Sequence, residues 1–260
     1  MMENNSDDQG RQVGKRAEEV VQWYFRLNGF FLIPGFIVHP DAPRLKPRTE
    51  VDLLCLRLKD SNEGVWRGKN SGNFRSDAPT AMTDDSILVR SGLVGTVKKH
   101  LVGMVEVKAG ECHINGAWSK QERSNDSGRN NMERALARVG FGNRAEIERA
   151  ANAMYSDLRY EGNDFVVQYF AIGKTISLHL SQEHPKLIQV TFDQIANFFR
   201  LRFMGFPEKI PQDKTISLWD GFGNSFRWWF ESNGGLRAPA EQACHAAVRR
   251  YIETGRCQGH

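Results

Sequence analysis

Residues 101–109 read LVGMVEVKA, a run in which apolar residues surround one glutamate and one lysine. Its apolar density predicts a buried strand. Because side chains alternate between the two faces of a strand, Glu106 and Lys108 would share one face while Val105 and Val107 share the other. A carboxylate and an ammonium group are therefore expected side by side on a central strand.

A second strand carrying acidic residues is predicted at residues 50–58, which read EVDLLCLRL. Its alternation places Glu50 and Asp52 on one face. The apolar residues expected on the other face are Val51, Leu53 and Cys55. If the two strands are neighbours in the sheet, Asp52 can face Glu106.

A helix is predicted at residues 13–28, where apolar residues recur at helical spacing, and Gly29 is expected to end it. Glu18 lies at the margin of the buried face of this helix, whereas Glu19 points almost oppositely. Glu18 is therefore the better candidate for a third carboxylate near the sheet.

These residue types suit phosphodiester hydrolysis, which needs acids to hold a hard cation and positive charge where the transition state becomes more anionic. The segments GKRAE (14–18), EVDLL (50–54) and VEVK (105–108) occur in the order typical of the PD-(D/E)XK superfamily. The chain resembles these restriction-endonuclease-like nucleases, and most closely the archaeal Holliday-junction resolvases and type IV restriction enzymes.

The resemblance implies an α/β fold with a central mixed β-sheet flanked by helices, a restriction-endonuclease-like core. Asp52, Glu106 and the backbone carbonyl of Val107 would bind Mg²⁺ or Mn²⁺. Lys108 would position the attacking water, and Glu18 would support a second metal or the water network. The resemblance further implies a magnesium-dependent endonuclease, with DNA as the substrate and a role in repair or in defence against foreign DNA.

Three parts of the chain are expected: a disordered N-terminus (1–11), a nuclease core (12–205) with an insertion at about 59–85, and an aromatic-rich C-terminal extension (206–260). The extension could bind a second copy or a partner protein. Further strands are predicted at 30–38, 86–97, 113–118, 165–172 and 187–191, and further helices at 132–139, 144–158, 193–203 and 239–253.

Basic residues near the predicted site are candidates for contacts with nucleic-acid phosphates, although such runs are usually solvated turns. They are Arg44, Lys46, Arg48, Lys98 and Lys99. The net charge of +4 and the pI near 8.9 also suit a polyanionic partner.

Several residues have an ordinary structural explanation as well as a chemical one. Glu50 is either a further metal ligand or the solvated start of its strand. His39 and His113 are more readily structural residues than general bases. The aromatic residues of 219–230 are expected to pack in a core rather than stack on bases. A zinc site is disfavoured for the C-terminal residues Cys244, His245, Cys257 and His260.

The composition is that of an ordinary globular protein, with 40% hydrophobic and 25% charged residues. The N-terminus is polar and no apolar run approaches the roughly 20 residues of a membrane span, so a cytoplasmic location without membrane contact is expected. Two alternatives to an enzyme remain open at this point: an inactive nucleic-acid-binding module with the same fold, and an assembly protein in which the charges form an ion network.

Overall fold

A computed structural model describes residues 4–38, 49–59, 99–118, 127–140, 142–204, 220–234 and 239–258 of the chain. Its centre is a six-stranded mixed sheet, as the sequence predicts. The strands are β1 (Phe31–Val38), β2 (Thr49–Arg57), β3 (His100–Val107), β4 (Arg159–Glu161), β5 (Phe165–Gly173) and β6 (Ile188–Thr191). They run in the order β1-β2-β3-β5-β4, and β6 also pairs with β5. The β1, β2 and β3 strands are antiparallel, whereas β3, β5 and β6 are parallel.

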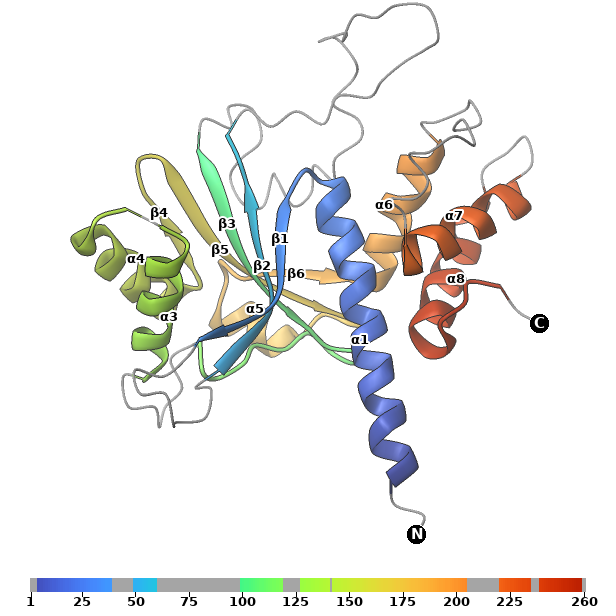
Figure 1. Ribbon diagram of the computed structural model, residues 1–260, viewed down its shortest axis with the longest axis horizontal. Coiled ribbons are helices and arrows are strands. Elements are labelled where there is room, and N and C mark those ends of the chain that lie inside the picture. Colours follow the sequence, from blue (N-terminus) through green and yellow to red (C-terminus); the bar gives the residue numbers. More distant parts are fainter. Residues whose placement is uncertain are drawn as a thin grey trace, which may run out of the picture.

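Helices cover both faces of this sheet (Figure 1). One face packs against α1 (Asn4–Leu27), α6 (Phe192–Met204), α7 (Gly221–Gly234) and α8 (Glu241–Thr254). The other packs against α3 (Ser127–Arg138), α4 (Arg144–Asp157) and α5 (Leu178–Glu183). The fold is therefore an α/β arrangement of three layers, with one hydrophobic core on each side of the sheet.

The alternation of side chains in the central strands produces these two cores. Val105 and Val107 enter the core under α1, and Met104 enters the core under α3 and α4. Gly103 of β3 lies against the side chains of Cys55 and Phe170. A Cβ added at Gly103 would clash with both. The central position of β3 therefore requires glycine at that point.

The predicted elements are largely confirmed, with corrections at the N-terminus and after β3. The first helix begins at Asn4, so residues 4–11 are helical and not disordered. The strand predicted at 113–118 is wrong, because the Asn115 side chain and carbonyl accept the amides of Ala117 and Trp118 and close a turn. The predicted insertion, apart from Lys59, and the strand predicted at 86–97 lie outside the described residues.

The described part of the C-terminal extension shares the core under α1 and does not form a core of its own. The ring of Phe226 lies 5.5 Å from that of Phe199 on α6, and Phe222 lies 5.0 Å from Tyr251 on α8. The packing interpretation of the aromatic segment is confirmed for these residues, while Trp228 is 64% exposed. No helix among the described residues is long and apolar enough to cross a membrane.

Candidate active site

The pairing of β2 with β3 brings the predicted acids together. Leu53 lies opposite Val105 at the last described pair of this antiparallel register, and Asp52 and Glu106 are the next residues beyond it on the two strands. The Asp52 carboxylate reaches across and its Oδ2 accepts the backbone amide of Val107 at 2.7 Å. The two acids and the Val107 backbone thus meet at the end of β3, as the sequence predicts.

Beyond the pairing with β3, the start of β2 departs from the expected alternation. Val51 was expected to share the face of Leu53 and Cys55, but it packs in the core on the opposite side of the sheet. The described pairing of β2 with β3 ends at Leu53, while the start of β2 stays paired with β1 through Val51, Glu50 and Thr49. Asp52 therefore lies just outside the described pairing of β2 with β3.

Glu106 is a buried acid, only 3% exposed, whose two carboxylate oxygens both have partners. Lys108 Nζ lies 2.6 Å from Oε1, and the Tyr169 hydroxyl donates to Oε2 over 3.5 Å. Burial raises the pKa of Glu106, the charge of Asp52 raises it further, and the bond from Lys108 opposes both. The carboxylate is therefore fixed in place yet carries negative charge at an energetic cost.

Lys108 is part of the same electrostatic unit. Burial acts to lower the pKa of its ammonium group, but the hydrogen bond to Glu106 and the charges of Asp52 and Glu18 raise the pKa overall. Lys108 therefore remains charged at neutral pH, with its side chain 42% exposed at the edge of the cluster. That exposure leaves the ammonium able to meet an incoming phosphate or water.

Glu18 joins the cluster from α1. Burial raises the pKa of Glu18 to about 7, with the charges of Asp52 and Glu50 acting in the same direction and Lys108 opposing them. These interactions put the Glu18 carboxylate on the acid side of the sheet end, as predicted from its place on the helix. The carboxylates of Glu106, Asp52 and Glu18 therefore all act on the Lys108 ammonium, and Glu50 acts on Glu18.

The donor set suits a hard divalent cation. It consists of oxygens, carries an excess of negative charge, and includes two carboxyl groups whose pKa values are raised first by burial and then by neighbouring carboxylates. As they stand, no three His, Cys, Asp or Glu side chains among the described residues converge tightly enough to hold a metal. Lys108 and the Val107 amide instead occupy oxygens of Glu106 and Asp52.

Tyr169 on β5 is a site residue that the sequence pattern did not single out. It is fully buried, and its hydroxyl faces Glu106 from the neighbouring strand. Burial raises the pKa of Tyr169 well above its ordinary value, and the charge of Glu106 adds to this, so the hydroxyl keeps its proton and acts as a donor. The available signal was a tyrosine hydroxyl, next to Gln168, in the otherwise apolar run 165–172.

The outcome for the remaining predicted acid and for the basic residues is mixed. Glu50 is exposed at the start of β2, and its carbonyl accepts the Trp118 indole N–H at 3.1 Å. The prediction that Lys99 flanks the site is wrong. Lys99 pairs with Glu161 at 2.7 Å and lies at the other end of β3 from Glu106, about 23 Å away along the strand. The other four, Arg44, Lys46, Arg48 and Lys98, lie outside the described residues.

The histidine and cysteine alternatives receive no support from the described residues. His113 is exposed, and His39 lies outside the described residues, as does His260. Cys244 and Cys257 are buried free thiols, and His245 instead lies beside Asp193 and Glu241. The interpretation of these cysteines as buried thiols is confirmed.

Glu19 serves the fold on the opposite flank of α1. Its carboxylate accepts the Phe222 amide at 2.6 Å and the Tyr251 hydroxyl at 2.7 Å, which ties α1 to the start of α7 and to α8. Arg16 adds two bonds of 2.7 Å to the carbonyls that end α8, those of Ile252 and Glu253. The rotation of α1 that presents Glu18 to the sheet is therefore held from behind.

Replacing Glu18 by glutamine should stabilise the protein at pH 8 and leave its stability unchanged near pH 4. The folded state holds the Glu18 proton up to about pH 7, whereas an unfolded chain releases it near 4.5, so ionisation between these values penalises folding. Glu18→Gln removes that penalty. Thermal melts should show a Tm higher by about 2 °C or more at pH 8. A lower Tm at pH 8 would show that the carboxylate stabilises the fold and is no part of a strained acid cluster.

Replacing Tyr169 by phenylalanine should weaken divalent-metal binding by about tenfold or more, because Glu106 loses the donor that orients its Oε2. The volume of the core changes little, so the Tm should fall only modestly. Calorimetric titration with Mn²⁺ reports the affinity independently of any activity. Unchanged affinity would assign the Tyr169 hydroxyl to the core alone.

Comparison of the chain with protein-family models, with curated proteins and with solved structures found no match. The functional argument therefore rests on the geometry of the site and on the resemblance carried by its motifs.

Proposed function

We propose that the chain is a metal-dependent nuclease of the restriction-endonuclease-like type, which cleaves phosphodiester bonds within DNA. The observation that carries the proposal is the hydrogen bond by which Asp52 on β2 accepts the Val107 amide, next to Glu106 on β3. Lys108 bonds to Glu106, and Glu18 interacts with these groups from α1. The four charged residues come from three separate segments of the sequence. Their meeting at one sheet end is what a phosphodiesterase centre requires.

Each residue has a definite task in this proposal. Asp52, Glu106 and the Val107 carbonyl would hold the cation, with Glu50 within reach as a further ligand. A divalent ion bound there would lower the pKa of a bound water and offset charge on the phosphate. Lys108 would orient the attacking water and stabilise the charge that develops on the phosphoryl oxygens. Glu18 would accept a proton from the water network.

Metal binding would require a change in the existing contacts of Glu106. Lys108 must leave Glu106 Oε1, and its 42% exposed side chain has the freedom to do so. Tyr169 would continue to fix Oε2 from the buried side. The Lys108 ammonium would then interact with the attacking water and the phosphate instead of bonding to the carboxylate.

The test is incubation of the purified protein with supercoiled, linear and single-stranded DNA and with RNA, each in Mg²⁺, Mn²⁺ or EDTA. The proposal predicts nicking or linearisation of supercoiled DNA that EDTA abolishes. Binding without cleavage in either metal would favour an inactive module that retains the fold. Cleavage of RNA alone would correct the substrate while keeping the chemistry.

A further inference from the structure

The N-terminal part of α1 continues past the body of the protein (Figure 1). The helix has 24 residues and is therefore about 36 Å long. Its packing against the core begins at Val13 and becomes complete at Ala17, whereas residues 8–12 are exposed. About two turns of helix thus stand free beside the end of the sheet that carries the candidate site.

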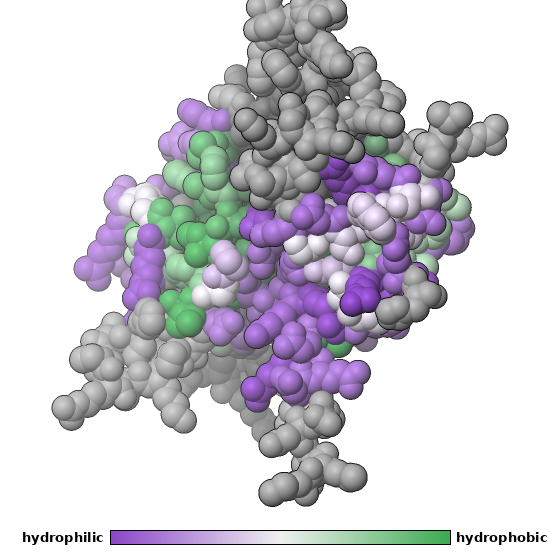
Figure 2. All heavy atoms as spheres, turned by 45° about the vertical axis from the view of Figure 1, so that its right-hand side comes forward, coloured by the Kyte–Doolittle hydropathy of each residue, from purple (hydrophilic) through white to green (hydrophobic). Residues whose placement is uncertain are grey.

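Two exposed basic side chains, that of Arg11 on this free part and that of Lys15 about one turn further along the helix, line up with Glu18. Successive helical residues are separated by 100°, so Lys15 lies about 40° from Arg11, and Glu18 lies about 20° from Arg11 on its other side. Arg11 and Lys15 are both exposed, and hydrophilic residues cover the projecting part of α1 at the bottom of Figure 2. Because Glu18 belongs to the acid cluster, this basic stripe leads directly away from the site.

Two glycines in the N-terminal half of α1 also have no packing role among the described residues. A Cβ added to Gly10 or to Gly14 would meet nothing within 4 Å. Glycine in an exposed helix is less stable than alanine, so these positions weaken the helix without relieving any contact inside the protein. What these glycines provide is open space beside the helix backbone. Gly14 lies about 60° from Arg11, on the flank of the basic stripe, where a partner could approach the helix backbone closely.

We propose that the phosphate backbone of the nucleic-acid substrate lies along this face of α1, with Arg11 and Lys15 contacting phosphates and Gly14 marking the closest approach. The inference rests on the proposed function and names the surface by which that site receives its substrate. The two basic residues are separated by about 6 Å along the helix axis, which spans roughly two phosphates of one DNA strand. Asp8 is the one acid with a described side chain between positions 8 and 15, and it lies a turn further from the site.

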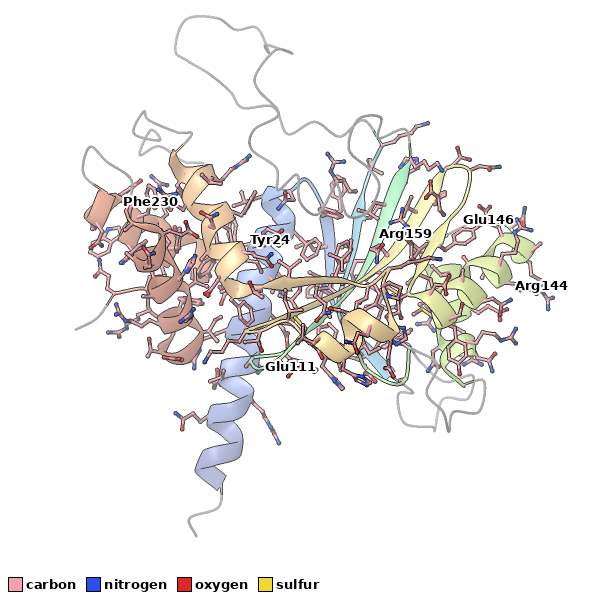
Figure 3. The ribbon with its side chains drawn as sticks, turned by 180° about the vertical axis from the view of Figure 1, so that it is seen from behind. Tyr24, Glu111, Arg144, Glu146, Arg159 and Phe230 are labelled. Atoms are coloured by element: carbon pink, nitrogen blue, oxygen red, sulfur yellow. The ribbon has the colours of Figure 1, made fainter. Side chains whose placement is uncertain are left out.

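Removal of the two charges in Arg11→Met/Lys15→Met tests the phosphate contacts. Binding of a labelled DNA duplex is measured in EDTA across a range of KCl concentrations, so that no cleavage occurs. The matched control is Arg144→Met/Lys186→Met, which removes two exposed charges on the far side of the molecule; Arg144 is labelled in Figure 3. The α1 variant should bind at least tenfold more weakly at 0.15 M KCl, and its salt slope should fall by about 1.8. The control should keep the wild-type slope.

A pair of substitutions at Gly14 tests the close approach. Gly14→Ala and Gly14→Leu should both raise the Tm, because both residues favour helices and the position is open. The bulky leucine should nevertheless weaken DNA binding at least tenfold, while alanine should keep it close to wild type. Wild-type binding by Gly14→Leu would overturn the close approach.

The outcomes separate this inference from the proposed function. Wild-type affinity and salt slope in Arg11→Met/Lys15→Met, together with metal-dependent cleavage by the unaltered protein, would overturn the α1 surface alone. Absence of both binding and cleavage in the unaltered protein would overturn the surface and the proposed function together.

Discussion

Glu106→Gln and Asp52→Asn are each expected to lower metal-dependent cleavage by about a thousandfold or more, because each removes a charged oxygen ligand at nearly constant volume. Both variants should fold, since the amide oxygens can still accept the existing bonds from Lys108 and the Val107 amide. Cleavage rates of supercoiled DNA in Mg²⁺ and Mn²⁺ measure the effect. Thermal melts show whether each variant is folded.

The matched control for these substitutions is Glu111→Gln. Glu111 is an exposed acid a few residues beyond Lys108 in the chain, and it is labelled in Figure 3. It is outside the cluster that shifts the pKa of Glu106. Its removal should leave the cleavage rate unchanged. Full activity in Glu106→Gln or in Asp52→Asn would remove that residue from the site.

Lys108→Met is expected to lower turnover by about a hundredfold or more at saturating substrate, while DNA affinity changes far less. Methionine keeps much of the side-chain stem and removes the charge. The loss of this ammonium also raises the pKa of Glu106, whose bond to Lys108 opposes the effects of burial and Asp52. Residual activity should therefore require a higher pH than in the unaltered protein, because Glu106 must be ionised to bind metal.

Lys99→Met provides the comparison for Lys108, since Lys99 immediately precedes the same strand but lies at its other end and pairs with Glu161. It should retain full turnover. If Lys108→Met instead kept its turnover and lost affinity with a reduced salt slope, the lysine would be a phosphate tether and the catalytic assignment would fail.

Local patterns predicted the centre of the fold well. The alternation of β3 is readable from the sequence, and the pairing of β2 with β3 brings Asp52 to the Val107 amide beside Glu106. The helix α4 starts where the pair Asn143 and Glu146 predicts, because the Asn143 side chain accepts the Glu146 amide at 3.0 Å. Such features depend on residues a few positions apart, so the sequence shows them directly.

Features that depend on distant contacts were not predictable in the same way. The helix α7 contains three glycines, including its last residue Gly234, and was missed; its start is held by Glu19, 203 residues before Phe222 in the chain. Lys99 was wrongly assigned to the site, because local sequence does not reveal its partner Glu161, which lies 62 residues away in the chain. Tyr169 looked like an ordinary core residue, since its role depends on the parallel pairing of β5 with β3.

The most direct test of the central claim is a calorimetric titration of the protein with Mn²⁺ at pH 7.5, repeated on Asp52→Asn and Glu111→Gln. The account holds that Asp52 and Glu106 jointly bind a divalent cation at the end of β3. It predicts saturable binding by the unaltered protein and by Glu111→Gln, and loss of that binding in Asp52→Asn. No binding by the unaltered protein, or equal binding by Asp52→Asn, would contradict it.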